Sequence, residues 1–426
     1  MPEPRHEFRR SWRGSNLPDH PAFVRRSRGW SGKGALRRME PDGTGASYAG
    51  QDLRGARLKG AVLRSAVFRE AAVEGADLTQ ADLAGADFRD ARAGEADFGG
   101  AMLEDARFDG ATLRFASFRE AVIDGATFEG ADLWGAELDR AEAVDARFRG
   151  ARLEEASLAG AKLSGADFRD ANLKRADLRG AVLKGAILDD AQLAGARLDG
   201  ADLGNARLAG VDLSGCTLPR VRLADVWLER TRLRQDQLGD AIGEEAESDF
   251  GAARLGYLAL EQNFRGLGDP EAASWAYRKG RRMGKLEARR QALLALRERR
   301  WVEARKNTTY WASDVFAEWL CDYGESLLRV TRAFLVVFVV FLAYYDLSGS
   351  LVRESGAELG GPDSTATDLG ELAAFTLLTM TTAGPPDNVG VKPRSVAAYL
   401  VSGIHGAIGT SLIGLFGFVL GNRIRR

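Results

Sequence analysis

Residues 51–234 repeat a hydrophobic pattern with a period of five. Leu or Phe fills nearly every fifth position from Leu53 to Leu233, and Ala stands two residues earlier 31 times in succession, from Ala56 to Ala206. Neither a helix, with a period of about 3.6, nor a flat strand, with a period of about 2, keeps one face buried at this spacing. A square solenoid does, because four pentads complete one coil with Leu or Phe inward and Ala at the tight corner. The exceptions at the Leu/Phe position are Val73, Ala93, Ile123 and Ala143.

This pattern resembles the pentapeptide-repeat family, whose unit is written A(D/N)LxX. The resemblance implies a right-handed quadrilateral β-helix over residues 46–235. The 37 pentads make about nine coils, or a rod of roughly 45 Å at the spacing of neighbouring strands. From Val211 onward other residues replace Ala, as expected for coils that pack against something new. Cys216 falls in this register, so we expect a small buried side chain and not a reactive thiol.

Charge and chemistry limit what the repeat region can do. Residues 51–234 hold 32 Asp/Glu and 27 Lys/Arg, a net charge of −5. Pentapeptide-repeat proteins that mimic DNA and inhibit gyrase need a strongly negative surface, so this near-balance disfavours a DNA-mimic inhibitor, and no nucleic-acid partner is expected. No His, Cys or paired carboxylate recurs here with catalytic or metal-ligand spacing. We therefore expect no catalytic residue, no metal site, no cofactor and no enzyme activity.

The segments on either side of the repeats have a different composition. Residues 1–45 are rich in Arg and poor in aliphatic side chains, which predicts a basic disordered tail. Residues 236–325 are expected to form an α-helical linker. Its first helix is predicted over 249–265 from the spacing of its apolar residues. The side chains expected to point inward are Phe250, Leu255, Leu258 and Phe264.

The second half of the linker is first basic and then aromatic. Pro270 opens a long helix, and the stretch from Arg278 to Lys306 carries twelve Lys/Arg against three Glu. Two interpretations stay open for this stretch: contact with anionic membrane lipid, or a solvated face packed against acidic residues of a neighbouring subunit. Residues 307–309 are expected to break the helix. Residues 310–323 then form an amphipathic helix, either in the membrane interface or packed on the soluble part. Its acidic side carries Asp314, Glu318 and Asp322.

Two apolar stretches predict a membrane module over residues 326–426. Spans are expected at about 327–347 and 395–422, and the second has 28 residues without a charge, enough to cross a hydrocarbon core of about 30 Å. Arg residues stand before the first span and after the second, whereas residues 346–387 between the spans are acidic. The positive-inside rule therefore places both termini in the cytoplasm. With two cysteines and no apolar signal segment, we expect a multi-pass protein of the inner (plasma) membrane.

The loop between the spans holds a short segment, 365–390, that predicts a pore loop. Asp368 and Glu371 are spaced as a capping box for a helix that begins at Leu369. The sequence TLLTMTTAGPPD at its end resembles the pore helix and filter of two-helix potassium channels, close to TxxTxTTxGYGD. The resemblance implies a homotetrameric pore with the loop as its external constriction. The matching residues are Thr376, Thr379, Thr381, Thr382, Gly384 and Asp387.

Pro385 and Pro386 stand where the potassium channels have Tyr-Gly. A potassium filter stacks its carbonyl groups through glycine conformations that proline, with φ fixed near about −65°, cannot adopt. We therefore expect a pore that is not specific for potassium, in which a ring of Asp387 favours cations as the permeating ions. The predicted pore and filter residues are Thr379, Thr381, Thr382, Ala383, Gly384, Pro385, Pro386 and Asp387.

The second span adds three candidates for pore lining or gating, His405, Gly409 and Gly414. Glycines recur along this span, mostly three or four residues apart, which allows close helix packing and, as a second use, a bend. They are Gly403, Gly406, Gly409, Gly414, Gly417 and Gly421. His405 is either a pore-facing proton sensor or a group hydrogen-bonded between helices. The sequence thus predicts a multidomain protein: a β-helix that serves as scaffold or sensor, an α-helical linker, and a two-helix transmembrane pore for passive ion conduction. The alternatives are a non-conducting, membrane-anchored interaction scaffold and a DNA-mimic inhibitor.

Overall fold

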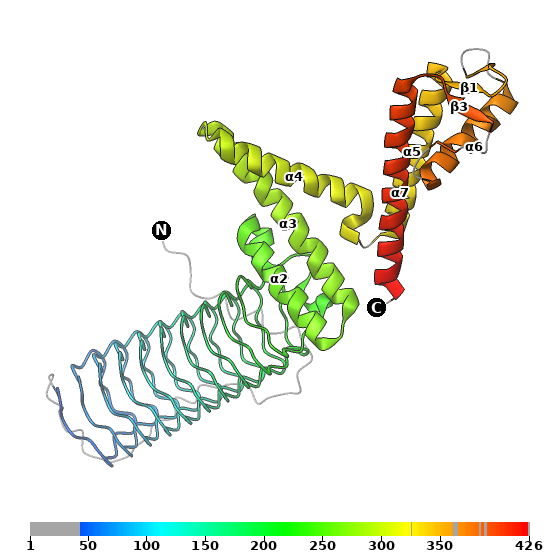
Figure 1. Cartoon of the computed structure of the whole chain (residues 1–426). Helices are drawn as coiled ribbons and strands as arrows, with labels where there is room; N and C mark the ends of the chain where they lie inside the picture. The colour runs from blue at the N-terminus through cyan, green and yellow to red at the C-terminus, as the bar shows by residue number, and fades with distance from the viewer. Residues whose placement is uncertain (1–42, 325, 361–364, 383–384, 387–389, 425–426) are drawn as a thin grey trace, which may run out of the picture. The chain divides into compact units, whose positions relative to one another are not determined.

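The computed structural model describes residues 43–324, 326–360, 365–382, 385–386 and 390–424, with the side chains of 422–424 left aside. Nearly all of the predicted N-terminal tail lies outside these residues. Figure 1 shows the elements in chain order, from a stack of square coils through a helical segment to the C-terminal helices.

The repeat region forms the predicted solenoid. Isolated parallel bridges join residues that are twenty apart, from Ser47 and Val67 to Asp212 and Arg232, so four pentads complete one coil. The Leu/Phe and Ala positions are fully buried through most of the stack, which confirms the inward and corner roles expected from the period of five. Cys216 is buried as well, and burial raises the pKa of its thiol to about 11.

The buried phenylalanines stack on one another from coil to coil. The ring centroids of Phe88 and Phe108 lie 4.8 Å apart with nearly parallel planes, and Phe98 stands edge-on to both at 5.6 Å. This spacing equals the distance between neighbouring coils, so each ring continues a column through the core. The column with stacked rings contains Phe68, Phe88, Phe108, Phe128, Phe148 and Phe168.

A buried carboxylate helps to close the C-terminal end of the stack. Glu244 in helix α1 (Gly243–Ala246) accepts hydrogen bonds from the backbone N–H groups of Leu223 and Ala224, each at 2.6 Å. These donors have no further coil to pair with, so the side chain replaces the missing strand. Desolvation of the fully buried Glu244 raises the pKa of its carboxyl group, although the two hydrogen bonds lower it.

Helix α2 (Phe250–Leu267) follows the short helices η1 (Gln235–Leu238) and α1. Phe264 is buried and Phe250 half-buried, but the inward placement predicted for Leu255 and Leu258 is wrong, because both are exposed. The face of α2 that packs on the end of the β-helix is formed by neighbouring positions, such as Gly256 and Tyr257. It carries small residues that allow close approach, as at Gly256, where a Cβ atom would lie 3.3 Å from the backbone of Leu223. The buried residues are Ala253, Gly256, Tyr257, Leu260, Glu261, Asn263 and Phe264.

Helices α3 (Pro270–Arg297) and α4 (Trp301–Cys321) form a hairpin. Pro270 is the first residue of α3, as predicted, with Asp269 capping the backbone N–H of Ala272. The break expected at 307–309 is wrong, because the chain turns earlier, at Arg299, whose φ of 59° is left-handed. Thr309 is helical within α4, and its hydroxyl donates to the carbonyl of Arg305.

The C-terminal part contains helices α5 (Leu327–Ser348), α6 (Ala366–Thr382) and α7 (Val396–Ile424). The segments that connect these helices form a small antiparallel sheet, in the order β2-β1-β3, which the sequence did not predict. Its strands are only two or three residues long: β1 (Leu351–Arg353), β2 (Glu358–Leu359) and β3 (Val391–Pro393).

The predicted start of the pore helix is wrong by three residues. Helix α6 begins at Ala366, and Thr365 precedes it as the cap. The backbone N–H of Asp368 donates to the Thr365 hydroxyl at 3.3 Å, and the Asp368 carboxylate accepts from the Thr365 N–H at 2.8 Å. This is a capping box with Asp368 as its last member and not its first, so Glu371 is left to pair elsewhere.

Replacing Phe108 by Ala should destabilise the β-helix by about 3–5 kcal/mol, because it removes one ring from the stacked core and leaves a cavity. Met102→Ala is the matched control, since Met102 lies on the outer surface and is 40% exposed; its effect should stay within about 0.5 kcal/mol. The measurement is unfolding of the full chain in detergent, followed by circular dichroism. Equal destabilisation by both variants would contradict a core held by the phenylalanine column.

Glu244→Gln should change how stability depends on pH. Because folding raises the pKa of Glu244, its contribution to the free energy of unfolding is fully present below the unfolded value, about 4.3, and is lost as pH rises through the raised pKa. Gln stays neutral, so the variant should gain on the native chain as pH rises. Unfolding of both proteins by denaturant between pH 4.5 and 8 tests this. A difference that is constant with pH would rule it out.

Candidate functional site

Helix α6 packs against both α5 and α7. The closest approach is at Gly409 in α7, where a Cβ atom would lie 2.4 Å from the carbonyl oxygen and 2.5 Å from the Cα of Met380. No side chain fits this space, because the neighbour is backbone. Met380 is also fully buried in a cluster with Ala333 of α5 and Leu412 of α7. The three helices therefore meet at the C-terminal end of α6.

The threonines of α6 divide into two pairs. Thr376 and Thr379 are fully buried, and their hydroxyls donate to the carbonyls of Leu372 and Phe375 at 2.7 Å. Thr381 and Thr382, the last residues of the helix, are exposed. Of the predicted filter residues, Thr379 therefore belongs to the packed side of α6, and Thr381 and Thr382 lie at its open end.

The remaining predicted filter residues follow α6 directly. Pro385 and Pro386 are half-buried and have no regular secondary structure. Ala383, Gly384 and Asp387 lie outside the described residues. Of the predicted filter, the structure thus shows the helix with its terminal threonines. The constriction itself stays a prediction.

His405 lies between helices and is fully buried in the chain. Its ring stacks on Phe341 of α5, with centroids 4.0 Å apart, and its Nδ1 lies 3.3 Å from the Tyr345 hydroxyl. Tyr345 in turn stands edge-on to Phe375 of α6 at 5.4 Å. Of the two roles weighed for His405, this arrangement matches a group hydrogen-bonded between helices. It ties all three helices together one helical turn from Gly409.

The two glycines predicted as gating candidates differ in their surroundings. Gly409 lies against the backbone of α6, whereas a Cβ atom added at Gly414 would meet no described atom within 4 Å. Both residues are helical within α7. Gly409 therefore has a packing role within the chain that Gly414 does not share.

One arginine holds the start of α6 on the small sheet. Arg353 in β1 donates from Nη2 to Asp368 at 2.6 Å and from Nε to Glu371 at 2.8 Å. Sequence reasoning counted these carboxylates as part of an acidic loop, but two of them are neutralised by this contact. Across the sheet Arg394 pairs with Glu358 at 2.6 Å.

The outer faces of α5 and α7 are apolar and uncovered. Within the described residues these are the two helices long and apolar enough to cross a membrane, over Leu327–Ser348 and Val396–Gly421. Only 11% of the most apolar part of the first and 28% of that of the second are buried. Core helices of soluble proteins also pass a test of length and composition, but they are mostly buried.

Two carboxylates of α4, Asp314 and Glu318, face α3. Asp314, which is almost fully buried, forms an ion pair with Arg281, and Glu318 forms one with Lys285. Desolvation raises the pKa of Asp314 and outweighs the opposing effect of Arg281. One interpretation of the basic stretch was packing against acidic residues of a neighbouring subunit. Two of its cations, Arg281 and Lys285, do pair with acidic residues, but these belong to the same chain.

The opposite side of α4 is exposed and carries aromatic side chains. Phe316 and Trp319 lie there, and the guanidinium of Arg332 in α5 stands over the Trp319 ring at 5.7 Å. Arg332 also donates to the Trp319 carbonyl at 3.0 Å, and Arg329 donates to that of Glu318 at 2.6 Å. Helix α4 is therefore amphipathic in the reverse of the usual way: Asp314 and Glu318 face α3, whereas Phe316 and Trp319 lie on the exposed side.

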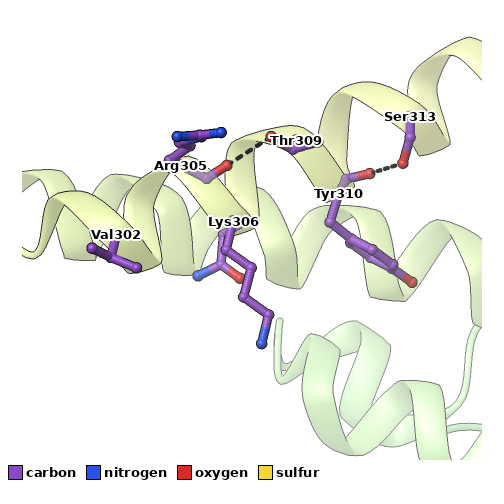
Figure 2. Close-up of a pocket in the computed structure, with 7 residues that line it drawn as sticks. Val302, Arg305, Lys306, Thr309, Tyr310 and Ser313 are labelled. Carbon is purple, nitrogen blue, oxygen red and sulfur yellow. Dashed lines mark hydrogen bonds between the residues drawn. The ribbon is translucent and has the colours of Figure 1, made fainter.

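A hollow of about 760 Å³ opens along α4 (Figure 2). Lys306 and Tyr310 project from one side of the helix, and Arg305 and Thr309 from the other. The Thr309 and Ser313 hydroxyls donate to the carbonyls of Arg305 and Tyr310. Within the described part of the chain, neither Arg305 nor Lys306 has an ion-pair partner. The lining residues are Val302, Arg305, Lys306, Asn307, Thr309, Tyr310 and Ser313.

Sequence reasoning missed several residues of this region. Arg353 had one signal, as the only cation among residues 346–387. Tyr345 had none, because its partner His405 is 60 residues away in sequence. No group of His, Cys, Asp or Glu among the described residues is arranged to hold a metal ion.

Comparison with known proteins concerns the repeat region first. The sequence profile described as Pentapeptide repeats matches in 8 copies, over residues 45–80, 81–119, 116–154, 151–190, 186–225 and 196–235. No curated protein is significantly similar to the chain.

Several solved structures resemble part of the chain. HetL, a pentapeptide repeat protein involved in heterocyst differentiation regulation in the cyanobacterium Nostoc, is 30% identical over 45% of this chain and 89% of its own, with a TM-score of 0.35. QnrB1, a plasmid-mediated fluoroquinolone resistance protein, is 22% identical over 46% of this chain and 92% of its own, with a TM-score of 0.29. A pentapeptide repeat protein of the Arabidopsis thaliana thylakoid lumen is 32% identical over 28% and 68%, with a TM-score of 0.16.

Each of these structures covers less than half of this chain, so the comparisons do not identify a function for the whole protein. The profile match and the observed coils agree on the repeat region. The chain belongs to the pentapeptide-repeat family, through a right-handed β-helix in residues 45–235.

Proposed function

We propose that the protein is a membrane pore of the two-helix, pore-loop type, which conducts cations passively and carries its β-helix as a cytoplasmic scaffold or sensor. The observation that carries the proposal is the seat of α6 between α5 and α7. A 17-residue helix, too short to span by itself, lies against two longer helices whose outer faces are apolar and uncovered. A re-entrant helix of a pore has this relation to its two spans.

Charge supports the orientation of the pore. Arg329 and Arg332 stand at the start of α5, and the sequence after α7 ends in further arginines, so these ends are cytoplasmic by the positive-inside rule. The small sheet and the start of α6 are then external. The proposal places the protein in the inner (plasma) membrane as a multi-pass homotetramer, since four copies would surround one axis with their α6 ends.

Helix α4 supports a membrane setting from the cytoplasmic side. Its exposed aromatic face leads into α5 after a short turn at 322–324, and Trp319 with Arg332 resembles the aromatic and cationic residues that mark a membrane interface. Contact between anionic lipid and the basic stretch from Arg278 to Lys306 is part of the proposal. Arg281 and Lys285 are excluded from that contact because they pair with α4.

A second candidate function is a membrane-anchored scaffold that does not conduct. The observation in its favour is the pair Pro385 and Pro386 directly after α6, at the point where a filter needs flexible backbone. The helices would then serve as an anchor, and the rod would be the working surface. Conductance separates the two functions.

Pure protein in liposomes should give resolved single-channel currents, with a reversal potential near zero between equal concentrations of KCl and NaCl, because a cation pore without a potassium filter passes both cations. Pro385→Tyr/Pro386→Gly should move the reversal potential toward that of potassium, because it restores the Tyr-Gly of the filter pattern. A native chain that is already potassium-selective would contradict the altered selectivity. Silence of both proteins, with insertion confirmed by protease protection, would favour the scaffold.

Gly409→Ala should disrupt the pore, because its Cβ atom would lie 2.4 Å from the Met380 carbonyl oxygen and α6 would have to move. We expect about 1–3 kcal/mol of destabilisation and strong loss of ion flux. Gly414→Ala is the matched control in the same helix. Its thermal stability should hold or rise slightly, as Ala favours a helix by about 1 kcal/mol over Gly. If flux and stability respond alike at both positions, α6 is not seated at Gly409.

A further inference from the structure

We propose that the hollow on α4, together with the turn between α3 and α4, binds the phosphodiester headgroup of an anionic lipid at the cytoplasmic membrane surface. The inference rests on the proposed membrane location and adds a specific site to it. It concerns one end of the α3–α4 hairpin, residues 293–313.

Apolar side chains at this end of the hairpin are unusually exposed. Val302 is 85% exposed, the highest value of any large apolar residue described, and Trp301 beside it is 67% exposed. Leu293 and Leu296 at the end of α3 are exposed as well. Water is a poor environment for such a cluster, whereas the acyl boundary of a membrane accommodates it.

Cations surround these apolar residues without being neutralised. Within the described residues, Arg297, Arg299, Arg305 and Lys306 have no ion-pair partner. Arg300 is different, because Glu298 and Glu303 both pair with it. The turn therefore keeps a surplus of positive charge at the place where the apolar residues protrude.

The hollow offers hydrogen-bond donors of the kind that a phosphate oxygen accepts. Arg305 and Lys306 extend from it in different directions, and the half-buried Asn307 adds an amide (Figure 2). Thr309 and Ser313 have their hydroxyl protons engaged with carbonyls of α4, so the charged groups supply the recognition.

The outer face of α4 has one continuous character. Val302, Arg305, Thr309 and Phe316 follow at spacings of three, four and seven residues and so lie on one side of the helix. Asp314 and Glu318 lie on the side that packs on α3, where they are paired. An outer face without carboxylates, apolar at both ends and cationic between them, suits a helix lying in a membrane surface that contains anionic lipid.

The chemistry favours lipid over other sources of phosphate. A nucleic acid or a free phosphate ester would satisfy Arg305 and Lys306 but would leave Trp301 and Val302 in water. A lipid supplies the phosphodiester and the apolar layer together. Helix α4 also ends at Cys321, close in sequence to the proposed span that begins at Leu327.

The test uses full-length protein in nanodiscs, with a bimane fluorophore on Val302→Cys. Cys216 and Cys321 are both buried, so labelling is selective. Quenching by spin-labelled lipid is measured as phosphatidylglycerol replaces phosphatidylcholine. Arg305→Gln/Lys306→Gln should move half-maximal quenching to a higher phosphatidylglycerol fraction, because each Lys/Arg near an anionic surface strengthens binding to it. Arg57→Gln/Lys59→Gln, which removes two exposed charges from the β-helix, should leave it unchanged.

Other results would overturn the site. Equal quenching in pure phosphatidylcholine would mean apolar insertion without headgroup recognition, and no quenching in any disc would mean that the turn does not reach the membrane. Competition by soluble glycerol phosphate at micromolar concentration would identify a free phosphate ester as the ligand. Incorporation into discs and ion flux are recorded on the same samples, so failure of the proposed pore is distinguished from failure of the headgroup site.

Discussion

The seat of α6 depends on one contact between backbones. Gly409 lets α7 approach Met380 so closely that no Cβ atom fits between them. Around this point Ala333, Met380 and Leu412 are buried, and one turn away His405 joins Phe341 and Tyr345. Small residues at such crossings are typical of helices that associate in lipid, where apolar burial gives little driving force and close packing must supply it. The same contact fixes where the terminal threonines of α6 emerge.

A second constraint is the distribution of charge between α3 and α4. Each carboxylate that α4 turns toward α3 meets a cation there, Asp314 with Arg281 and Glu318 with Lys285. A buried ion pair of this kind specifies an orientation more than it adds stability, because desolvation offsets much of the attraction. Here the orientation decides which side of α4 remains outside. Without the pairing, nothing would hold the acidic side of α4 against α3.

Prediction from sequence succeeded where one periodicity dominates and failed where distant residues decide. A period of five admits one kind of coil, so the burial of Phe108 or Ala126 follows from local sequence. The helix turn at Arg299 was missed because Asn307 and Thr309 are only weak helix breakers, and α4 simply continues through them. Gly409 and Gly414 look alike in sequence. Only the neighbour in α6, about 30 residues earlier, separates them.

In the candidate site, the sequence predicted the helices but not the sheet that connects them. The apolar runs predicted α5, α7 and the short helix between them as helices, and the structure has all three. That α5 and α7 span a membrane stays a prediction from length and composition. The three-stranded sheet could not be foreseen, because strands of two or three residues carry no periodic signal. Arg353 acts through it, as β1 brings a cation to Asp368 and Glu371 from 15 and 18 residues away.

The α3–α4 hairpin and the apolar helices α5 and α7 are connected through residues 322–324. Asp322 and Tyr323 have left-handed φ values of 51° and 59°, which cost energy for residues other than Gly. Arg281 of α3 stands over the Tyr323 ring at 5.1 Å, and Gly324 lies close to Phe418 of α7. Any movement of α3 relative to α7 must change these contacts. The strained turn at 322–324 is thus held by contacts with both α3 and α7.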